Sequence, residues 1–136
     1  MDFQKMVDFR NTHNPFAAKL GIVVEEIGPG YARVTKTIRE DDLNPVGRAH
    51  GGCFFAMADT ACGSAAASSG YMAVTVNASY NFFRGGNVGD VITAEAREIK
   101  HGATICVFEV QLTNQKKAVV GSATLTFFML EQKIEL

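Results

Sequence analysis

Residues 51–69 read GGCFFAMADTACGSAAASS, and this stretch decides the fold. It is rich in alanine, its only β-branched residue is Thr60, and Gly70 follows it, so it predicts an α-helix of about five turns. Its only charged residue is Asp59. Because a helix that is apolar on nearly all sides belongs in the interior of a protein, we expect this helix to be buried at the centre of the fold.

Strand patterns lie on both sides of this helix in the sequence. Before it, residues 22–27 and 31–38 predict a hairpin around the turn Gly28-Pro29-Gly30. After it, short turns join four more predicted strands, at 73–83, 89–99, 103–113 and 118–130. An antiparallel β-sheet wrapped around one long central helix accommodates this order of elements, so the predicted fold class is α+β.

The first 20 residues predict a separate N-terminal helical segment. Helical spacing relates four of its residues, Phe3, Met6, Val7 and Arg10. Asn14-Pro15 then predicts the start of a second, short helix. A chain of 136 residues can bury a core without metal or disulfide support, so residues 1–136 are predicted to form one domain.

Composition excludes several function classes. The chain carries 13 Lys plus Arg against 14 Asp plus Glu, for a formal net charge of -1, which argues against a general nucleic-acid or membrane binder. No segment is apolar enough over a sufficient length to span a membrane, and charges interrupt the N-terminus where a secretory signal would be apolar. Three cysteines without a C-x-x-C pair indicate reduced thiols, so we expect a cytoplasmic protein.

Asp59 is the first candidate for chemistry. An ionised carboxylate among apolar side chains costs several kcal/mol unless it is paired or reaches water. Asp59 therefore either hydrogen-bonds a neighbouring loop or partner chain, or faces a cleft in which it can act on a substrate.

Gly51 and Gly52 are the second candidate, because they stand where the loop enters the predicted helix. The first turn of a helix has unpaired N–H groups, and glycines leave them bare, so an acyl oxygen can approach closely. Gly51 and Asp59 are eight positions apart, about 12 Å along a helix, which is too far for both to act on one carbonyl within one subunit. Two antiparallel helices across a two-fold axis would bring Asp59 of one subunit near Gly51 of the other, so we expect a homo-oligomer.

The loop and helix together resemble a known family. The run Asn44-Pro45-Val46-Gly47-Arg48-Ala49-His50-Gly51-Gly52, followed by Phe55, Ala58-Asp59 and Ala61, is similar to the signature of hotdog-fold acyl-CoA thioesterases. The resemblance covers about residues 14 to 130. Asp rather than Glu at the carboxylate position favours the PaaI-like (phenylacetate-pathway) subgroup.

This resemblance implies roles for individual residues. Asp59 would act as nucleophile or general base on the thioester, and the Gly51 amide would polarise its carbonyl, while Asn44 and His50 would position the site. A hydroxyl on the strand after the helix often assists, and Thr75 is the nearest match. The remaining predicted substrate contacts are Gly52, beside Gly51, and Arg84, at a turn that often lines the coenzyme A channel.

The resemblance also implies a substrate and an assembly. The substrate would be a small aromatic or medium-chain acyl-CoA, hydrolysed to free acid and CoA without a further cofactor. The protein would be a homodimer or homotetramer with active sites at the subunit interface. Five aromatic residues are candidates for lining the acyl pocket, namely Phe54, Phe55, Tyr80, Phe82 and Phe83.

Two alternative functions remain open on the same fold. Hotdog enoyl-CoA hydratases carry Asp-x-Asn-Pro-x-His, and residues 42–46 begin this pattern, but Gly47 stands where the histidine belongs. A non-catalytic acyl-CoA-binding protein is the other alternative, and an assay of CoA release distinguishes it from an enzyme.

Alternative catalytic groups are weaker candidates. His50 could itself serve as the base, although a histidine directly before a helix is more often a positioning residue. Cys53 lies in the first helical turn, where a thiolate is favoured, so a Cys53–His50 pair is conceivable. None of the three histidines has a Cys, Asp or His partner at metal-ligand spacing, so we expect no metal site.

Overall fold

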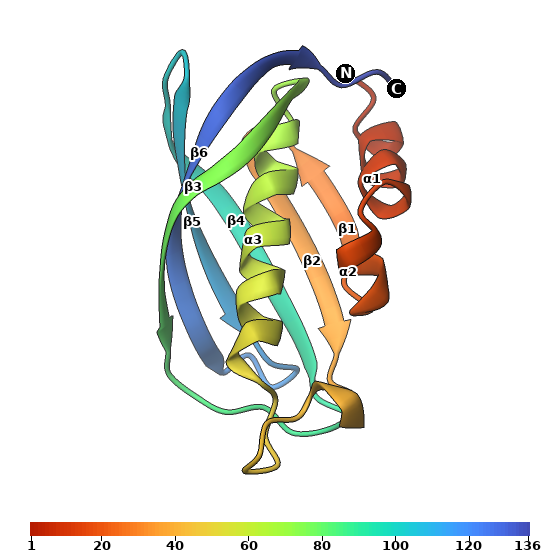
Figure 1. Cartoon of the computed structure of the whole chain (residues 1–136), viewed down its shortest axis with the longest axis vertical. Coiled ribbons are helices and arrows are strands. Elements are labelled where there is room, and N and C mark those ends of the chain that lie inside the picture. Colours follow the sequence, from red (N-terminus) through yellow and green to blue (C-terminus); the bar gives the residue numbers. More distant parts are fainter.

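The central helix α3 runs from Gly51 to Ala67 and packs against one face of a six-stranded antiparallel sheet (Figure 1). The computed structural model describes all 136 residues. Its strands are β1 (Val23–Gly28), β2 (Tyr31–Thr37), β3 (Tyr71–Phe82), β4 (Val91–His101), β5 (Ile105–Thr113) and β6 (Val119–Lys133). They pair in the order β1-β2-β4-β5-β6-β3. The predicted α+β fold, an antiparallel sheet around one long helix, is confirmed.

Most of α3 is buried, as its sequence predicts. Eleven of its 17 residues are buried, and Met57, Ala58 and Ala61 have no exposed surface. On the strands that face it, buried residues alternate with more exposed ones, for example at Ala94 on β4 and Phe108 on β5. This alternation is typical of an antiparallel sheet with one face on the core.

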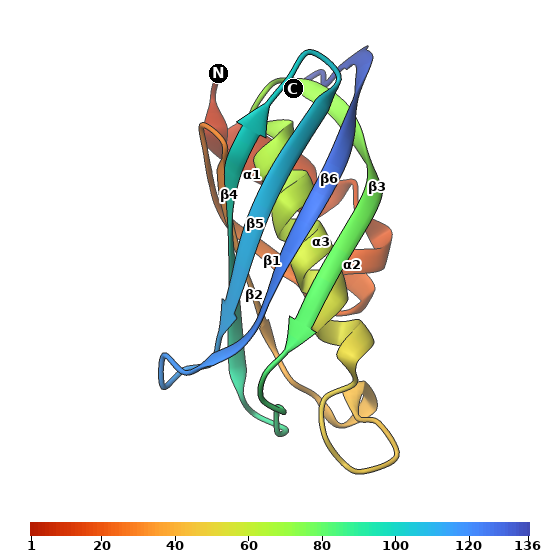
Figure 2. The same cartoon turned by 90° about the vertical axis from the view of Figure 1, so that its left-hand side faces the viewer.

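The N-terminal segment covers one edge of the sheet. It forms two helices, α1 (Phe3–Thr12) and α2 (Pro15–Lys19), and α1 lies alongside β1 (Figure 1). The Asn11 side chain donates to the carbonyl oxygen of Val24 and accepts from its N–H, both at 2.9 Å. This contact pins α1 to the edge strand β1. The opposite edge strand, β3, has no such cover within the chain (Figure 2).

A buried ion pair anchors the loop between β2 and α3. This loop contains a short 3₁₀ turn (Glu40–Asp42), and the Lys36 Nζ lies 2.9 Å from an Asp42 carboxylate oxygen. Both side chains are almost completely buried. The Asp42 carbonyl oxygen accepts a hydrogen bond of 2.8 Å from the His50 N–H, so the ion pair also fixes the entry into α3.

Several element boundaries differ from the predicted ones by up to three residues. Helix α3 ends at Ala67 rather than at 69, because the Ser68 and Ser69 hydroxyls donate to carbonyl oxygens of the last turn. Strand β6 continues to Lys133 rather than 130, because Lys133 pairs with Tyr71 at the start of β3. None of the helices combines the length and the hydropathy needed to cross a membrane.

Candidate active site

The backbone N–H of the first residue of α3 has no acceptor within the chain. His50 caps this helix, and its Nδ1 accepts a hydrogen bond of 2.8 Å from the Gly52 N–H. Its carbonyl oxygen accepts from the Cys53 N–H at 2.9 Å. The Gly51 N–H makes no hydrogen bond within the chain. A free N–H at the positive end of a helix suits a developing negative charge, so Gly51 rather than Gly52 is the free donor.

Both glycines stand in close contact with neighbouring side chains. A Cβ at Gly52 would lie 3.0 Å from His50 Nδ1, and a Cβ at Gly51 would lie 3.1 Å from the Phe82 ring. A side chain at position 52 would therefore disturb the cap, and one at position 51 would push against the aromatic wall beside the free amide.

The His50 ring caps α3 and has no free acceptor in this geometry. The Gly52 N–H is a donor, so Nδ1 must use its lone pair as the acceptor. In the neutral ring the proton then lies on Nε2, and no lone pair remains to accept a proton from substrate or water. The alternative of His50 as general base does not fit this arrangement.

Asn44 orders the loop that leads to His50. Its side-chain oxygen accepts hydrogen bonds of 3.1 Å from the N–H groups of both Val46 and Arg48. The Arg48 carbonyl oxygen accepts from the Asn44 N–H at 2.7 Å, and Gly47 has a φ of 79° that favours glycine. Asn44 thereby closes the tight turn in front of α3.

A cavity of about 450 Å³ opens beside the Gly51 amide. It brings together three predicted site residues, Asn44, Gly51 and Arg84, and three aromatic residues, Phe54, Phe82 and Phe83. Its remaining lining includes Arg48 and Gly85, which also line an adjoining cavity of about 570 Å³ together with Arg84 and Lys116. The site is thus an apolar hollow next to a basic one.

Asp59 lies two turns further along α3. Its Oδ1 accepts a hydrogen bond of 2.6 Å from the Thr75 hydroxyl on β3, so the structure brings these two predicted residues together. The carboxylate is half-buried and stands beside the uncovered edge of the sheet. Within one chain, however, it is separated from Gly51 by about 12 Å of helix, as the sequence predicts.

Arg10 is a neighbour of this carboxylate that the sequence analysis did not identify as a site residue. Its Nε donates to the Ser64 hydroxyl at 3.1 Å, and its Nη2 lies 3.0 Å from the position of a Cβ on Gly63. Burial lowers the pKa of Arg10, and the negative charge of Asp59 acts in the opposite direction. The sequence did contain a signal for this residue. Arg10 is a basic residue at a position that helical spacing groups with the apolar residues of the N-terminal segment.

Cys53 and Asp42 do not line the cavity beside Gly51. Burial raises the pKa of Cys53 to about 11, so the thiol form dominates and the proposed Cys53–His50 pair lacks a thiolate. Burial alone would raise the pKa of Asp42, but hydrogen bonds from the Lys36 ammonium and the Arg39 N–H outweigh it and lower that pKa. The Asp42 carboxylate is therefore an ionised partner inside the fold.

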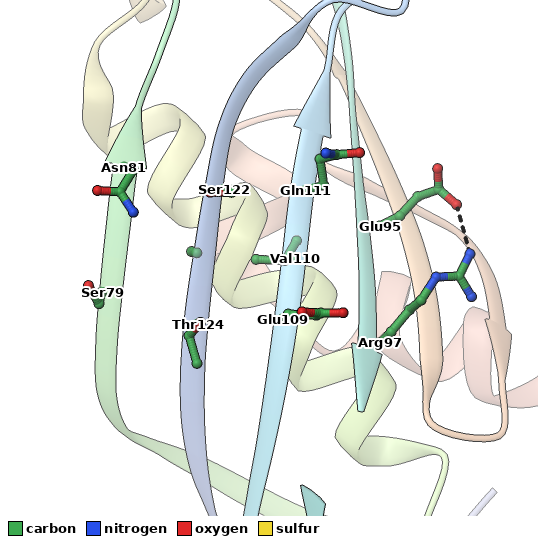
Figure 3. A pocket seen from close by; sticks show the side chains of 10 residues that line it. Ser79, Asn81, Glu95, Arg97, Glu109, Val110, Gln111, Ser122 and Thr124 are labelled. Atoms are coloured by element: carbon green, nitrogen blue, oxygen red, sulfur yellow. Dashed lines mark ion pairs between the residues drawn. The ribbon is translucent and has the colours of Figure 1, made fainter. Parts of the chain in front are cut away.

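A further cavity of about 440 Å³ lies on the outer face of the sheet, away from α3 (Figure 3). Polar side chains from β3, β4, β5 and β6 line it, among them Ser79, Thr124, Glu109 and the pair of Glu95 with Arg97, at 3.8 Å. It contains none of the predicted site residues.

Comparison with known proteins identifies the family. The thioesterase superfamily model matches residues 46–120. Acyl-coenzyme A thioesterase PaaI of Escherichia coli is 36% identical over 105 residues, which cover 77% of this chain and 75% of that protein.

Solved structures agree with this assignment. The E. coli PaaI protein from the phenylacetic acid degradation operon superposes with a TM-score of 0.88 at 29% identity, covering 98% of this chain and 100% of that one. A hypothetical thioesterase from Streptococcus pneumoniae, solved with coenzyme A, gives a TM-score of 0.85 at 31% identity, covering 93% and 99%. The chain belongs to the thioesterase superfamily, among the PaaI-like acyl-CoA thioesterases with the hotdog fold.

Proposed function

We propose that this enzyme hydrolyses a small aromatic or medium-chain acyl-CoA, with Asp59 as nucleophile or general base and the Gly51 amide as oxyanion donor. The observation that carries the proposal is the pair of groups on α3: a free N–H at its first residue and a carboxylate held by Thr75. The name of the E. coli relative and the coenzyme A in the S. pneumoniae structure support the substrate class.

The proposed chemistry follows from what each group offers. Attack on the thioester places negative charge on the carbonyl oxygen, and one well-aimed N–H donor stabilises that charge by about 2.7–4 kcal/mol. As a base, Asp59 would take a proton from the attacking water. As a nucleophile, it would displace the CoA thiolate and form a mixed anhydride, which water then hydrolyses. In both routes the sulfur leaves as thiolate and takes up a proton.

The proposed active site lies between two subunits. Strand β3 is a long, uncovered edge, and it exposes the apolar side chains Val74 and Val76. An edge of this kind favours pairing with a second strand. Pairing across a two-fold axis at β3 would set two α3 helices side by side, with Asp59 of one near Gly51 of the other. The homodimer is the minimal unit of this proposal, and a homotetramer would be two such dimers.

The two adjoining cavities suit two different parts of the proposed acyl-CoA substrate. Aromatic rings beside Gly51 suit an apolar acyl group, whereas Arg48, Arg84 and Lys116 suit phosphate groups of coenzyme A. Gly52 would contribute by shaping the helix start rather than by its N–H, which His50 occupies. The reaction needs no cofactor besides the coenzyme A of the substrate, and we expect it to take place in the cytoplasm.

The hydratase alternative fits this geometry less well. In its motif an aspartate works with a histidine, but the carboxylate of Asp42 is buried in the ion pair with Lys36. The alternative of a non-catalytic acyl-CoA binder is decided by experiment.

The decisive test is a panel of acyl-CoA substrates, with released CoA thiol measured for the wild type and for Asp59→Asn. We expect the variant to keep its circular dichroism and its oligomeric state while losing at least ~100-fold in turnover. Asp41→Asn, which changes an exposed carboxylate in the loop, is the matched control and should retain full activity. Binding of acyl-CoA by the wild type without release of thiol would instead identify a non-catalytic binder.

A further inference from the structure

A cluster of three metal-binding residue types lies at the far end of the sheet from the Gly51 amide. His101 Nδ1 lies 2.9 Å from a Glu98 carboxylate oxygen and 3.4 Å from the Cys106 sulfur. All three ligand atoms lie within 4.8 Å of one another. Glu98 and His101 belong to β4, and Cys106 is opposite His101 on β5.

A β-bulge brings the cluster together. Residues three apart on a regular strand point to opposite faces, so Glu98 and His101 would be separated. The pairing register shifts between Glu98, opposite Phe108, and Lys100, opposite Val107, which leaves Ile99 as the extra residue. The bulge therefore turns His101 to the face that Glu98, opposite Phe108, shares with Cys106. Bulges often re-aim a side chain in this way next to functional sites.

The surrounding backbone holds these residues rigidly. A Cβ at Gly102 would lie 2.7 Å from the Ile105 carbonyl oxygen, so the connection between β4 and β5 is a tight turn that requires glycine. The Glu98 N–H donates to the Gly30 carbonyl oxygen, and the Gly30 N–H donates to the Ser68 hydroxyl at the end of α3. The cluster thus lies near the C-terminal end of α3, whose partial negative charge favours a cation.

One nitrogen of the imidazole faces both of the other groups. A catalytic relay would use the two ring nitrogens in sequence, with the base between its two partners. Here Nδ1 alone contacts both the carboxylate and the sulfur, and its one proton or one lone pair serves only one of them at a time. The Cys106 thiol has a second, long contact of 3.9 Å with the Gly102 carbonyl oxygen. A single cation would engage the carboxylate, the ring nitrogen and the sulfur together.

We propose that Glu98, His101 and Cys106 bind a divalent transition metal of the Zn²⁺ class. Ligand bonds of about 2.0–2.3 Å in a tetrahedron place neighbouring ligand atoms roughly 3.3–3.6 Å apart. The separations of 2.9 and 3.4 Å from His101 Nδ1 lie close to these values, and the third, between the Glu98 oxygen and the Cys106 sulfur, is at most 4.8 Å. A Cys, His and carboxylate set selects a borderline-soft ion over Mg²⁺ or Ca²⁺.

The site has three protein ligands, of which His101 alone lines a cavity. Cys106 is fully buried, whereas His101 is 55% exposed and lines a cavity of about 500 Å³ with Ser69 and Glu131. On binding, the Cys106 thiol would release its proton to solvent and bond the metal as thiolate, while His101 binds as the neutral ring. Because the Cys106 thiol must lose its proton to bond the metal, metal binding should strengthen as the pH rises.

Titration of the reduced, full-length protein with Co²⁺ tests the proposal. We expect one equivalent to bind with a thiolate-to-cobalt charge-transfer absorption, to release a proton, and to be displaced by Zn²⁺. Cys106→Ser should abolish the absorption. His101→Gln changes an exposed position and should leave folding intact. It should weaken Co²⁺ binding by more than about tenfold, because even the loss of a residue that only orients a metal ligand typically costs at least that much.

His13→Gln is the matched control, because His13 is an exposed histidine outside the cluster, and it should bind Co²⁺ as the wild type does. Absence of the thiolate band in the wild type would overturn the proposal. The same conclusion would follow if His101→Gln bound Co²⁺ with unchanged affinity and an unchanged band. The readout is metal binding, so these outcomes do not depend on the function proposed for Asp59.

Discussion

The hydroxyl of Thr75 donates a hydrogen bond of 2.6 Å to the carboxylate of Asp59. The two residues are 16 positions apart and come from β3 and α3. The bond fixes the orientation of the carboxylate and leaves Oδ2 without a hydrogen bond within the chain. In the role proposed for Asp59, a carboxylate oriented in this way would act without first losing rotational freedom.

Thr75→Val removes this hydroxyl while keeping the branched shape of the side chain. A hydrogen bond to a charged group is worth about 1.5–3 kcal/mol, so kcat/KM should fall about 10- to 150-fold in the CoA-release assay. Thr124→Val, at an exposed position on the outer face of β6, is the matched control and should leave kcat/KM unchanged. Equal activity of the two variants would contradict a role for Thr75 in orienting Asp59.

Gly63 and Arg10 should be coupled in their effects on stability. Gly63→Ala improves helix propensity by up to about 1 kcal/mol, but its methyl group would press on the Arg10 guanidinium. We therefore expect no gain in the free energy of unfolding from Gly63→Ala alone. In an Arg10→Ala background, the same substitution should stabilise by about 0.5–1 kcal/mol. Urea unfolding of the four proteins measures this, and additive effects would contradict the packing described.

The ion pair of Lys36 with Asp42 should be essential to stability. Lys36→Met leaves the buried Asp42 carboxylate with Arg39, whose Nε lies 3.6 Å away, as its remaining cation, and the free energy of unfolding should fall by up to about 3–5 kcal/mol. A Lys36→Met/Asp42→Leu double variant should recover part of this loss, because it removes the buried charge. A double variant less stable than Lys36→Met would contradict this account.

The same pair predicts a pH dependence. The pKa of Asp42 is lowered in the folded protein, so its contribution to stability is present above its unfolded pKa and is lost as the pH falls through the folded value. The difference in free energy of unfolding between wild type and Asp42→Asn should therefore be largest above about pH 5 and shrink below about pH 4. Unfolding curves at a series of pH values provide the measurement.

Sequence reasoning predicted the features that depend on local pattern. The composition of residues 51–69 is enough to predict a buried helix, because a helix without a polar face has no other stable place. The free N–H at Gly51 also follows from position alone, since the first residues of any helix lack acceptors.

Features that depend on packing were outside its reach. Contact between Arg10 and Gly63 requires knowing which face of α1 meets α3. The cluster of Glu98, His101 and Cys106 depends on a bulge, and regular strand alternation predicts that Glu98 and His101 diverge. The expectation of no metal site rested on linear spacing, which does not detect side chains brought together by strand pairing.

The interface proposal predicts that two inactive variants restore activity to each other. Gly51→Pro removes the N–H donor itself, and proline is well suited to the first position of a helix. The preceding His50 has a ψ of 138°, which is compatible with a following proline. This variant should keep α3 and lose about 100- to 1,000-fold in kcat.

Mixing this variant with Asp59→Asn then separates a shared site from a site within one chain. If the donor and the carboxylate come from different subunits, each hybrid dimer contains one site with both groups intact. When equal amounts of the two variants exchange subunits completely, half of the dimers are hybrids. Each hybrid has one intact site out of two, so about a quarter of the wild-type activity should return. The control is a mixture of Thr75→Val with Asp59→Asn. Thr75 contacts the Asp59 of its own chain, so no hybrid of these two variants contains an intact pair and no activity should return. Hybrids that stay inactive after demonstrated subunit exchange would show that the donor and the carboxylate of one site do not come from different subunits, and would refute the shared interface.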